Sequence, residues 1–515
     1  MKDGKKGLTI RTTIDKKIQE TTQVLLQNHS MLLQNNLINN GAVIITEVKT
    51  GNIVAYVGNT DSDNDENGNA VNCIVAPRST GSILKPLLYA KSMEDGLITP
   101  TMLLQDIPSQ FGGFSPKNFA GTFEGAIPAN QALSRSLNIP MVYLLNNYGL
   151  SKFHNEIKNY GFSTLTQPAS HYGLSLILGG AEVSLFDLSK VYTQIAQEIA
   201  LGKSFNLSVN KADLSPTYLP RTDRSCSFAM LEAMTEVNRP DEDNNWKIFA
   251  SEQKIAWKTG TSFGFRDGWA IGITPNYVVS VWVGNADGEG RPGLTGTSAA
   301  APLLFSIFKT LKKANQWFRS PTQGMSYTKI CHESGHRASR LCPTVSTEWI
   351  PSTCLNSIAC PYHQVIHLSK TTKLRVDSDC EQMENMTHEI WFVLPPIIEK
   401  YYKITHPNHI PLPEFKPECL SKSAENSIGI IYPKPGSKIY IPIELSGKLG
   451  KTIFEATHRN DKLKIFWHLD DVFMGETKEI HQIAMSPTKG PHRLMLVDEN
   501  GIMVKVDFEV IGKRK

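Results

Sequence analysis

The sequence predicts an α+β protein in which helices flank an antiparallel sheet, followed by a cysteine-rich segment and a β-sandwich. The first observation is a pair of apolar runs joined by a Lys-Thr-Gly-Asn turn at 41–57, which predicts a hairpin. The second is a series of apolar, β-branched segments between 254 and 284, which is typical of a meander of strands. The third is a change to short alternating strands separated by turns from residue 427 onward, which favours a sandwich of immunoglobulin type.

The composition is that of an ordinary globular protein with several domains. The chain has 515 residues, of which 40% are hydrophobic and 20% charged. A net charge of +4 is nearly neutral for this length and argues against a dedicated nucleic-acid binder, which would concentrate basic residues on one face. No apolar run approaches the roughly 18 residues that span a bilayer. The basic N-terminus lacks the apolar core of a signal peptide, so we expect any anchor and export signal to lie outside this chain.

Helical patterns precede, separate and follow the two strand regions. Asp15 is a candidate N-cap, and Ile and Leu recur at helical spacing over 16–36. Residues 98–130, rich in Pro, Gly and Phe, are expected to be irregular, and such a long irregular stretch is usually functional. A helix is expected next, which Pro140 brings to an end. More helices follow, and a last one is expected over 300–316 to pack on the sheet.

These elements group into four segments. They are an N-terminal linker with a lead-in helix, the main α+β domain, a linker rich in Cys and Pro, and the C-terminal β-sandwich. We expect them at residues 1–40, 41–320, 321–425 and 426–515.

The third segment contains six of the eight cysteines: Cys331, Cys342, Cys354, Cys360, Cys380 and Cys419. Such clustering in a loop-rich segment favours disulfides and an oxidising compartment, although the connectivity cannot be deduced. Zinc is the alternative, because only two residues separate Cys360 from His363, and His332 and His336 are nearby. We favour disulfides, since the paired Cys-x-x-Cys spacing of common zinc modules is absent.

The most informative motif is the Ser82-Ile-Leu-Lys85 sequence, which follows a Gly and precedes an apolar, helix-like run. We expect Ser82 on the first turn of this helix, and residues three apart share a helix face, so the Ser82 hydroxyl and the Lys85 amine can meet. Serine needs a base to become a nucleophile, and a lysine can serve once burial or a neighbouring cation has lowered its pKa. The same spacing also occurs at Ser251, Ser306 and Ser486, so the motif alone is weak.

Two further motifs follow in the chain. Ser136 and Asn138 stand just before Ile139-Pro140, where a helix end would leave both side chains in a turn that can face a cleft. Lys258-Thr259-Gly260 lies on a predicted strand, where Gly260 would let a substrate backbone approach and Lys258 and Thr259 could hold a carboxylate.

Together these motifs, in this order, resemble the three signatures of the penicillin-recognising serine acyltransferases. The flanking sequences Arg78-Ser-Thr-Gly-Ser-Ile-Leu-Lys-Pro, Ser136-Leu-Asn-Ile-Pro and Trp257-Lys-Thr-Gly-Thr-Ser are similar to the transpeptidase domain of class A bifunctional penicillin-binding proteins. Cys331-x-x-Ser-Gly-His and the terminal sandwich fit the same family, so the resemblance covers essentially the whole chain. That family begins with a membrane anchor and a glycosyltransferase domain, neither of which is recognisable here. We therefore credit no glycosyltransfer to these residues.

The resemblance implies a serine transpeptidase fold and a peptidoglycan D,D-transpeptidase at the periplasmic face of the inner membrane. Ser82 would attack the D-Ala-D-Ala amide of a stem peptide, with neutral Lys85 as base and Ser136 passing the proton to the leaving amine. β-Lactams would acylate the same serine. Neither a metal nor an organic cofactor would be required.

The remaining site residues would bind the substrate. The resemblance implies that Asn138 holds the substrate amide, Lys258 and Thr259 hold the terminal carboxylate, and the N–H groups of Ser82 and Thr261 form the oxyanion hole. The donor stem peptide would come from a lipid-linked precursor or a nascent glycan strand. A separate glycosyltransferase or cell-wall protein is a further expected partner.

Other functions would use the same residues. A DD-carboxypeptidase or a β-lactamase would transfer the acyl group to water, and rapid penicillin turnover would identify the lactamase. A receptor acylated as a signal, or an inactive scaffold, would be no enzyme at all. We favour the transpeptidase among these alternatives.

Overall fold

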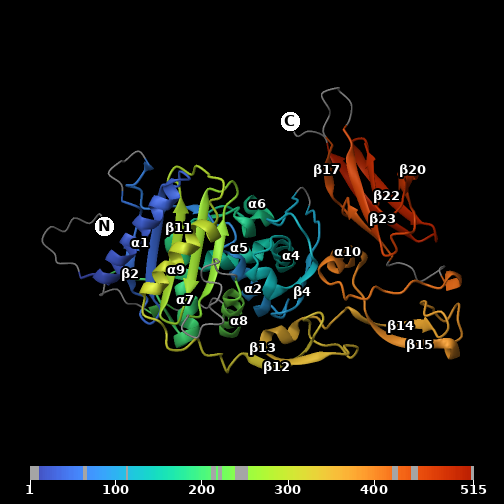
Figure 1. Cartoon of the computed structure of the whole chain (residues 1–515), viewed down its shortest axis with the longest axis horizontal. Coiled ribbons are helices and arrows are strands. Elements are labelled where there is room, and N and C mark those ends of the chain that lie inside the picture. The colour runs from blue at the N-terminus through green and yellow to red at the C-terminus, as the bar shows by residue number, and fades with distance from the viewer. Residues whose placement is uncertain are drawn as a thin grey trace.

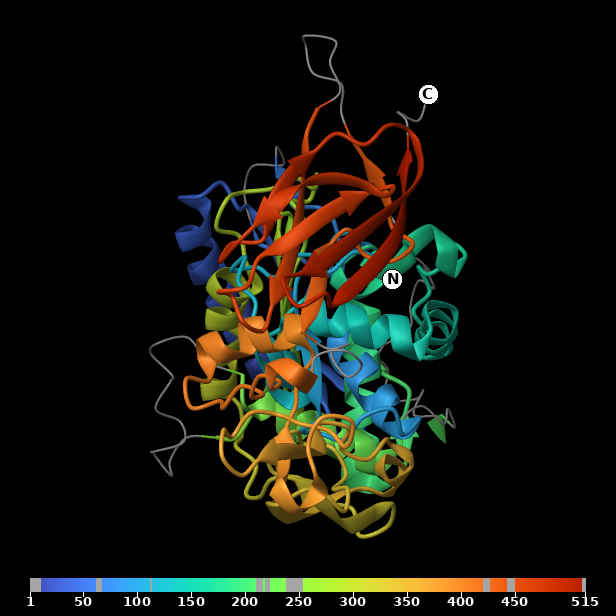
Figure 2. The same ribbon diagram turned by 90° about the vertical axis from the view of Figure 1, so that its right-hand side faces the viewer.

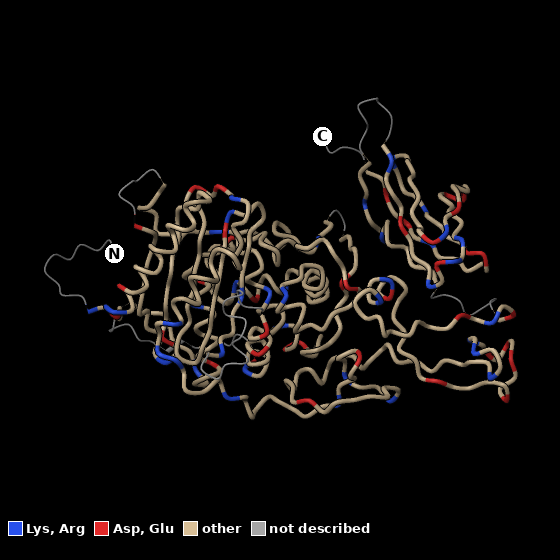
Figure 3. Tube along the Cα trace, viewed as in Figure 1, with Lys and Arg blue, Asp and Glu red and all other residues tan. Residues whose placement is uncertain are grey.

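The computed structural model describes residues 11–61, 67–111, 114–209, 216–217, 223–237, 253–419, 427–441 and 450–511. A five-stranded sheet lies at one end of the molecule and a β-rich C-terminal part stands at the other end (Figure 1). Two hairpins lie along the lower side of the molecule in this view, one below the helices beside the sheet and the other below the C-terminal part. Lys and Arg are interspersed with Asp and Glu along the whole trace (Figure 3). No helix in the described ranges is both long and apolar enough to cross a bilayer.

The central sheet is antiparallel with the strand order β2-β1-β11-β10-β9. The hairpin and the meander predicted from the sequence therefore join into one sheet, because β1 pairs with β11 along its whole length. The strands are β1 (Asn40–Glu47), β2 (Ile53–Val57), β9 (Ala256–Thr261), β10 (Asp267–Ile273) and β11 (Tyr277–Gly284). β9 is the edge strand of this sheet, next to β10 alone.

Helices cover both faces of the sheet, which explains why its strands are apolar without interruption. Val43 and Ile45 point to the face covered by α1 (Lys16–Gln34) and α9 (Ala301–Thr310), whereas Ile44 points to the opposite face. Asp15 caps α1 as predicted, its carboxylate accepting the N–H of Ile18 at 3.0 Å. The predicted last helix is shorter than expected and ends at Thr310.

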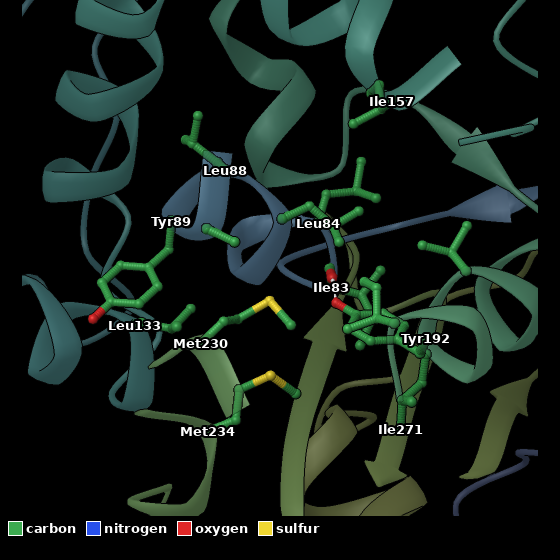
Figure 4. Packing of buried hydrophobic residues seen from close by; sticks show 14 of the residues in the cluster. Ile83, Leu84, Leu88, Tyr89, Leu133, Ile157, Tyr192, Met230, Met234 and Ile271 are labelled. Carbon is green, nitrogen blue, oxygen red and sulfur yellow. Dashed lines mark hydrogen bonds between the residues drawn. The ribbon is translucent and has the colours of Figure 1, made fainter. Parts of the chain in front are cut away.

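The opposite face packs on a layer of helices that contains the Ser82 segment. These helices are α2 (Lys85–Glu94), α3 (Ala129–Ser134), α4 (Ile139–Tyr148), α5 (Leu150–Asn159), α6 (Ala169–Tyr172), α7 (Leu185–Leu201) and α8 (Arg224–Thr235). Figure 4 shows Ile83 between Leu84 and Tyr192 of α7, in a buried cluster that also includes Ile271 of β10. The Tyr192 hydroxyl donates to the Ile83 carbonyl at 2.7 Å, so the backbone beside Ser82 is anchored in the core.

Two predictions for this layer need correction. Pro140 does not end a helix: α3 stops at Ser134, and Pro140 lies in the first turn of α4, where its missing N–H costs nothing. The stretch at 98–130 is not wholly irregular, because β4 (Leu103–Asp106) pairs with β5 (Gly125–Pro128). Short strand pairs complete the domain: β3 (Arg78–Ser79) with β6 (Glu182–Val183), and β7 (Ser204–Phe205) with β8 (Pro216–Thr217).

The cysteine-rich segment folds into two hairpins and a helix. The elements are β12 (Met325–Cys331), β13 (Val345–Pro351), β14 (His363–Ser369), β15 (Met386–Phe392) and α10 (Pro396–Thr405). One disulfide joins Cys380 to Cys419, and the other four cysteines of the segment are free thiols. The disulfide prediction therefore holds for one pair of the six cysteines.

The C-terminal part consists of two sheets around one apolar core that includes Trp467 and Phe508 (Figure 2). One sheet has the order β16-β18-β21 and the other β17-β23-β22-β19-β20. The strands are β16 (Ile428–Tyr432), β17 (Lys438–Tyr440), β18 (Thr452–His458), β19 (Ile465–Leu469), β20 (Val472–Thr477), β21 (Gln482–Met485), β22 (Gly490–Asp498) and β23 (Met503–Ile511). Lys400 of α10 bonds Glu455 of β18 at 3.2 Å. The expected domain boundary at 425/426 lies outside the described residues.

Candidate active site

Ser82 lies in a tight turn between β3 and α2 that packs against strand β9. The α-helix begins only at Lys85, so Ser82 precedes it rather than occupying its first turn as expected. Two glycines make the approach possible. A Cβ on Gly81, whose φ is +52°, would lie 2.5 Å from the Thr261 backbone nitrogen, and one on Gly260 would lie 2.6 Å from the Thr80 carbonyl oxygen. Any larger residue at either position would push the serine away from the strand.

Lys85 is fully buried, and its amine faces the turn between α3 and α4. Its Nζ donates to the carbonyl oxygens of Ser136 at 2.8 Å and Leu137 at 3.1 Å, and to Asn138 Oδ1 at 2.7 Å. Burial, together with the nearby Lys258 ammonium, lowers the pKa of Lys85 well below its ordinary value. The three oxygens, by contrast, suit a protonated amine with three N–H donors.

Ser136 links the two buried lysines. Its φ of +56° is unusual for a non-glycine residue and turns its carbonyl towards Lys85 and its hydroxyl towards Lys258. Lys258 Nζ donates to Ser136 Oγ and to the Thr259 carbonyl, both at 2.8 Å. Burial lowers the pKa of Lys258 to about 7. The structure thus brings Lys85, Ser136, Asn138 and Lys258 into one connected group.

The remaining predicted residues lie on β9 at the open edge of the sheet. Thr261 Oγ1 accepts the N–H of Gly296 at 3.0 Å, which fixes the end of this strand. Ser82 makes no hydrogen bond through its hydroxyl or its N–H within the part of the chain that the structure describes, so both are available to a ligand. An edge strand beside a partly buried serine can align an extended peptide for attack.

Two positioning residues escaped the sequence analysis. Asn118 Oδ1 accepts the backbone N–H groups of Asn138 at 3.0 Å and Ile139 at 3.2 Å. Its Nδ2 donates to Asp106 Oδ1 at 2.7 Å and to the Thr122 carbonyl at 2.9 Å. Asn118 and Asp106 are both buried, and burial raises the pKa of the Asp106 carboxyl. The only sequence signal was the length of the irregular stretch that contains them.

The competing motif copies lie elsewhere. Ser306 and Lys309 belong to α9, Ser486 and Lys489 lie between β21 and β22, and Ser251 falls outside the described residues. The second Lys-Thr-Gly, at Lys49, forms the turn between β1 and β2. Position in the fold therefore separates Ser82 from Ser306 and Ser486, which have the same spacing.

Comparison with known proteins identifies two families in the chain. Residues 41–309 match the family described as "Penicillin binding protein transpeptidase domain", and residues 417–508 match "Penicillin-Binding Protein C-terminus Family". No glycosyltransferase domain is found in the chain.

Relatives with curated descriptions are longer than this chain. Penicillin-binding protein 1C of Escherichia coli (strain K12) is 29% identical over 97% of the chain, which spans 64% of that protein. Penicillin-binding protein 1B of Haemophilus influenzae is 29% identical over 57% of the chain, which spans 39% of that protein.

Solved structures share the fold at low sequence identity. The PonA1 protein from Mycobacterium tuberculosis in complex with penicillin V has a TM-score of 0.50 at 18% identity, over 62% of this chain and 89% of that one. The family match covers more than half of the 515 residues. The chain therefore belongs to the penicillin-binding proteins with a transpeptidase domain, and it is similar to penicillin-binding protein 1C from that domain through to its C-terminus.

Proposed function

We propose that this chain is a serine D,D-transpeptidase that forms peptide cross-links in peptidoglycan and is acylated by β-lactams at Ser82. One observation carries the proposal: the buried amines of Lys85 and Lys258 both bond Ser136. The turn that contains Ser82 packs against the edge strand β9. Such a group can take a proton from the serine, return it to a leaving amine and bind a carboxylate.

The proposed acylation step uses Ser82, Lys85 and Ser136. The Ser82 hydroxyl attacks the carbonyl of the penultimate D-alanine and transfers its proton to neutral Lys85. Backbone N–H groups of Ser82 and Thr261 stabilise the oxyanion, a contribution of about 3 kcal/mol per donor in comparable sites. Ser136 then passes its proton to the departing D-alanine nitrogen and receives the proton held by Lys85, and the C–N bond breaks to leave an ester on Ser82.

The remaining residues of the site bind the substrate. Lys258 as an ammonium, with the Thr259 hydroxyl, binds the terminal carboxylate, and the Asn138 amide holds the substrate amide. Gly260 lets the peptide lie close against β9 as an added strand. An amine of a neighbouring stem peptide then attacks the ester. In a carboxypeptidase, water would take that place.

The compartment and the C-terminal part belong to the same proposal. The disulfide between Cys380 and Cys419 fits the oxidising environment outside the cytoplasm, where peptidoglycan is cross-linked. The two C-terminal sheets fit an immunoglobulin-like sandwich, which we propose binds a partner protein or the cell wall rather than contributing to catalysis.

Mass spectrometry of the intact protein after incubation with penicillin tests the proposal. We expect the mass of one penicillin to be added and the modified peptide to contain Ser82. Ser82→Ala should abolish labelling, whereas Ser306→Ala, which has the same Ser-x-x-Lys spacing in α9, should label like the wild type. A folded wild-type protein that takes up no penicillin would refute the proposed function.

A further inference from the structure

Four side chains with metal-binding atoms gather in the linker where the first hairpin meets the start of the second: Cys331, Cys342, Cys360 and His363. Their sulfur and nitrogen atoms all lie within 4.8 Å of one another. Cys331, Cys360 and His363 are buried, and Cys342 is half-buried. We propose that this Cys₃His cluster binds a structural zinc ion.

The distances within the cluster fit tetrahedral zinc. His363 Nδ1 lies 3.5 Å from Cys331 Sγ and 3.4 Å from Cys360 Sγ. Zinc bonds of about 2.3 Å to sulfur and 2.0 Å to nitrogen place neighbouring ligand atoms of a tetrahedron about 3.5 Å apart. The three thiols are free, whereas a disulfide would bring two sulfurs to about 2.0 Å.

The orientation of His363 supports a metal ligand. Its Nε2 lies 2.6 Å from a carboxylate oxygen of Glu333. A carboxylate accepts a hydrogen, so Nε2 carries the proton and Nδ1 presents its lone pair to the two sulfurs. A carboxylate that orients the far nitrogen of a ligating histidine is a recurring feature of zinc sites, because it fixes the ring and raises its basicity.

Two hydrogen-bond donors lie next to sulfur atoms of the cluster. The Ser339 N–H lies 3.3 Å from Cys342 Sγ, and the Ser334 hydroxyl lies 3.2 Å from Cys360 Sγ. Three thiolates and a neutral imidazole around Zn²⁺ leave a net charge of −1, which such donors would stabilise in a buried place. Four protein ligands also leave no open position, so the ion would be structural rather than catalytic.

The cluster lies where the linker meets the transpeptidase domain. In the turn that follows Cys331, the Ser334 carbonyl accepts the N–H of Leu103 at 2.9 Å, and the Gly335 carbonyl accepts the hydroxyl of Thr99. A bound ion would hold this turn, the loop containing Cys342 and the start of β14 together. Zinc would thus fix the linker hairpins against β4.

The metal content of the purified full chain tests the proposal. Elemental analysis by mass spectrometry should find about one zinc per chain, the number set by a single four-ligand site. Cys360→Ser and His363→Ala should lose the zinc. Cys226→Ser should keep it, because Cys226 is an equally buried free thiol that bonds Thr353 away from the cluster.

A second measurement keeps the proposal testable if those variants do not fold. Wild-type protein exchanged with Co²⁺ should show the thiolate charge-transfer and visible bands of a tetrahedral sulfur site. A peptide map of unreduced wild-type protein that joins any two of Cys331, Cys342 and Cys360 in a disulfide would overturn the proposal. So would a zinc content no higher than that of the His363→Ala variant. Neither readout depends on penicillin acylation.

Discussion

Replacing Asn118 with alanine should impair the proposed catalytic group without replacing any residue that is proposed to contact the substrate. The side chain makes four hydrogen bonds, two of them to the backbone of Asn138 and Ile139. At about 1 kcal/mol net for each bond, Asn118→Ala should lower the free energy of unfolding by about 4 kcal/mol. The two hydrogen bonds to the backbone contribute about 2 kcal/mol of this. If the same free energy is lost from the acylation transition state, the acylation rate should fall about 30-fold.

Asn118→Asp separates the two roles of this side chain. The aspartate keeps the acceptor for the two N–H groups but places a second carboxyl beside Asp106, whose pKa burial already raises. The pair would have to share a proton, so the pKa of one carboxyl in the folded state lies above its unfolded value. The stabilising contribution of this protonated carboxyl is present at low pH and is lost as the pH rises through its folded-state pKa. Acylation by this variant should therefore decline towards alkaline pH.

The assay is acylation by a fluorescent penicillin, followed over time and combined with thermal unfolding. Asn159→Ala serves as the control, because Asn159 is an exposed asparagine at the end of α5. The reasoning fails if Asn118→Ala unfolds at the wild-type temperature and reacts at the wild-type rate.

Three further predictions concern the strand edge and the C-terminal part. Burial lowers the pKa of Lys258 from 10.5 to about 7, so at pH 7 this residue costs about 4 kcal/mol of stability, a cost relieved as the pH rises towards 10. Lys258→Met should therefore raise the unfolding temperature while weakening penicillin binding; an unchanged melting curve would contradict this. Gly260→Ala should slow acylation because its Cβ would meet a backbone oxygen at 2.6 Å, and Gly58→Ala, whose Cβ would first meet the Asn72 side chain at 3.1 Å, is the control. Equal acylation rates for the two variants would argue against a close approach between β9 and the turn that contains Ser82. Deleting 426–515 should leave acylation intact, because the C-terminal core shares no residue with the cores around the sheet; lost acylation in a folded truncated chain would refute that independence.

The sequence was most informative where one pattern was repeated along an element. The strands of the central sheet followed from apolar and β-branched runs, and α1 followed from its spacing and the cap at Asp15. The turn at Ser136 was also expected, although for the wrong reason, since Pro140 starts a helix there instead of ending one. The residue types around Ser136 were enough to predict a turn. Whether Pro140 ends the helix before this turn or begins the helix after it depended on tertiary packing.

Residues that act through the backbone could not be predicted from the sequence. Asn118 contacts N–H groups twenty and twenty-one positions away, and every residue type except proline offers the same donor there. β4 and β5 are four residues each, too short for an alternating pattern to distinguish them from a loop. The cysteines posed a similar problem. Whether Cys331 and Cys360 pair with each other or with His363 depends on how the hairpins fold.

The Ser-x-x-Lys motif does not by itself explain how the Lys85 amine becomes a base. As placed, its amine donates to three oxygens, whereas the base that accepts the Ser82 proton must be neutral and have a free lone pair. A neutral amine has two N–H groups, so one of the three oxygens must be released before acylation. Two of them are backbone carbonyls of a tight turn. The third is Oδ1 of Asn138, a side chain that can rotate once its Nδ2 releases the Lys117 carbonyl, to which it donates at 2.8 Å. The residue proposed to hold the substrate amide is therefore also the one that can free the base, so substrate binding and activation of Ser82 would occur together.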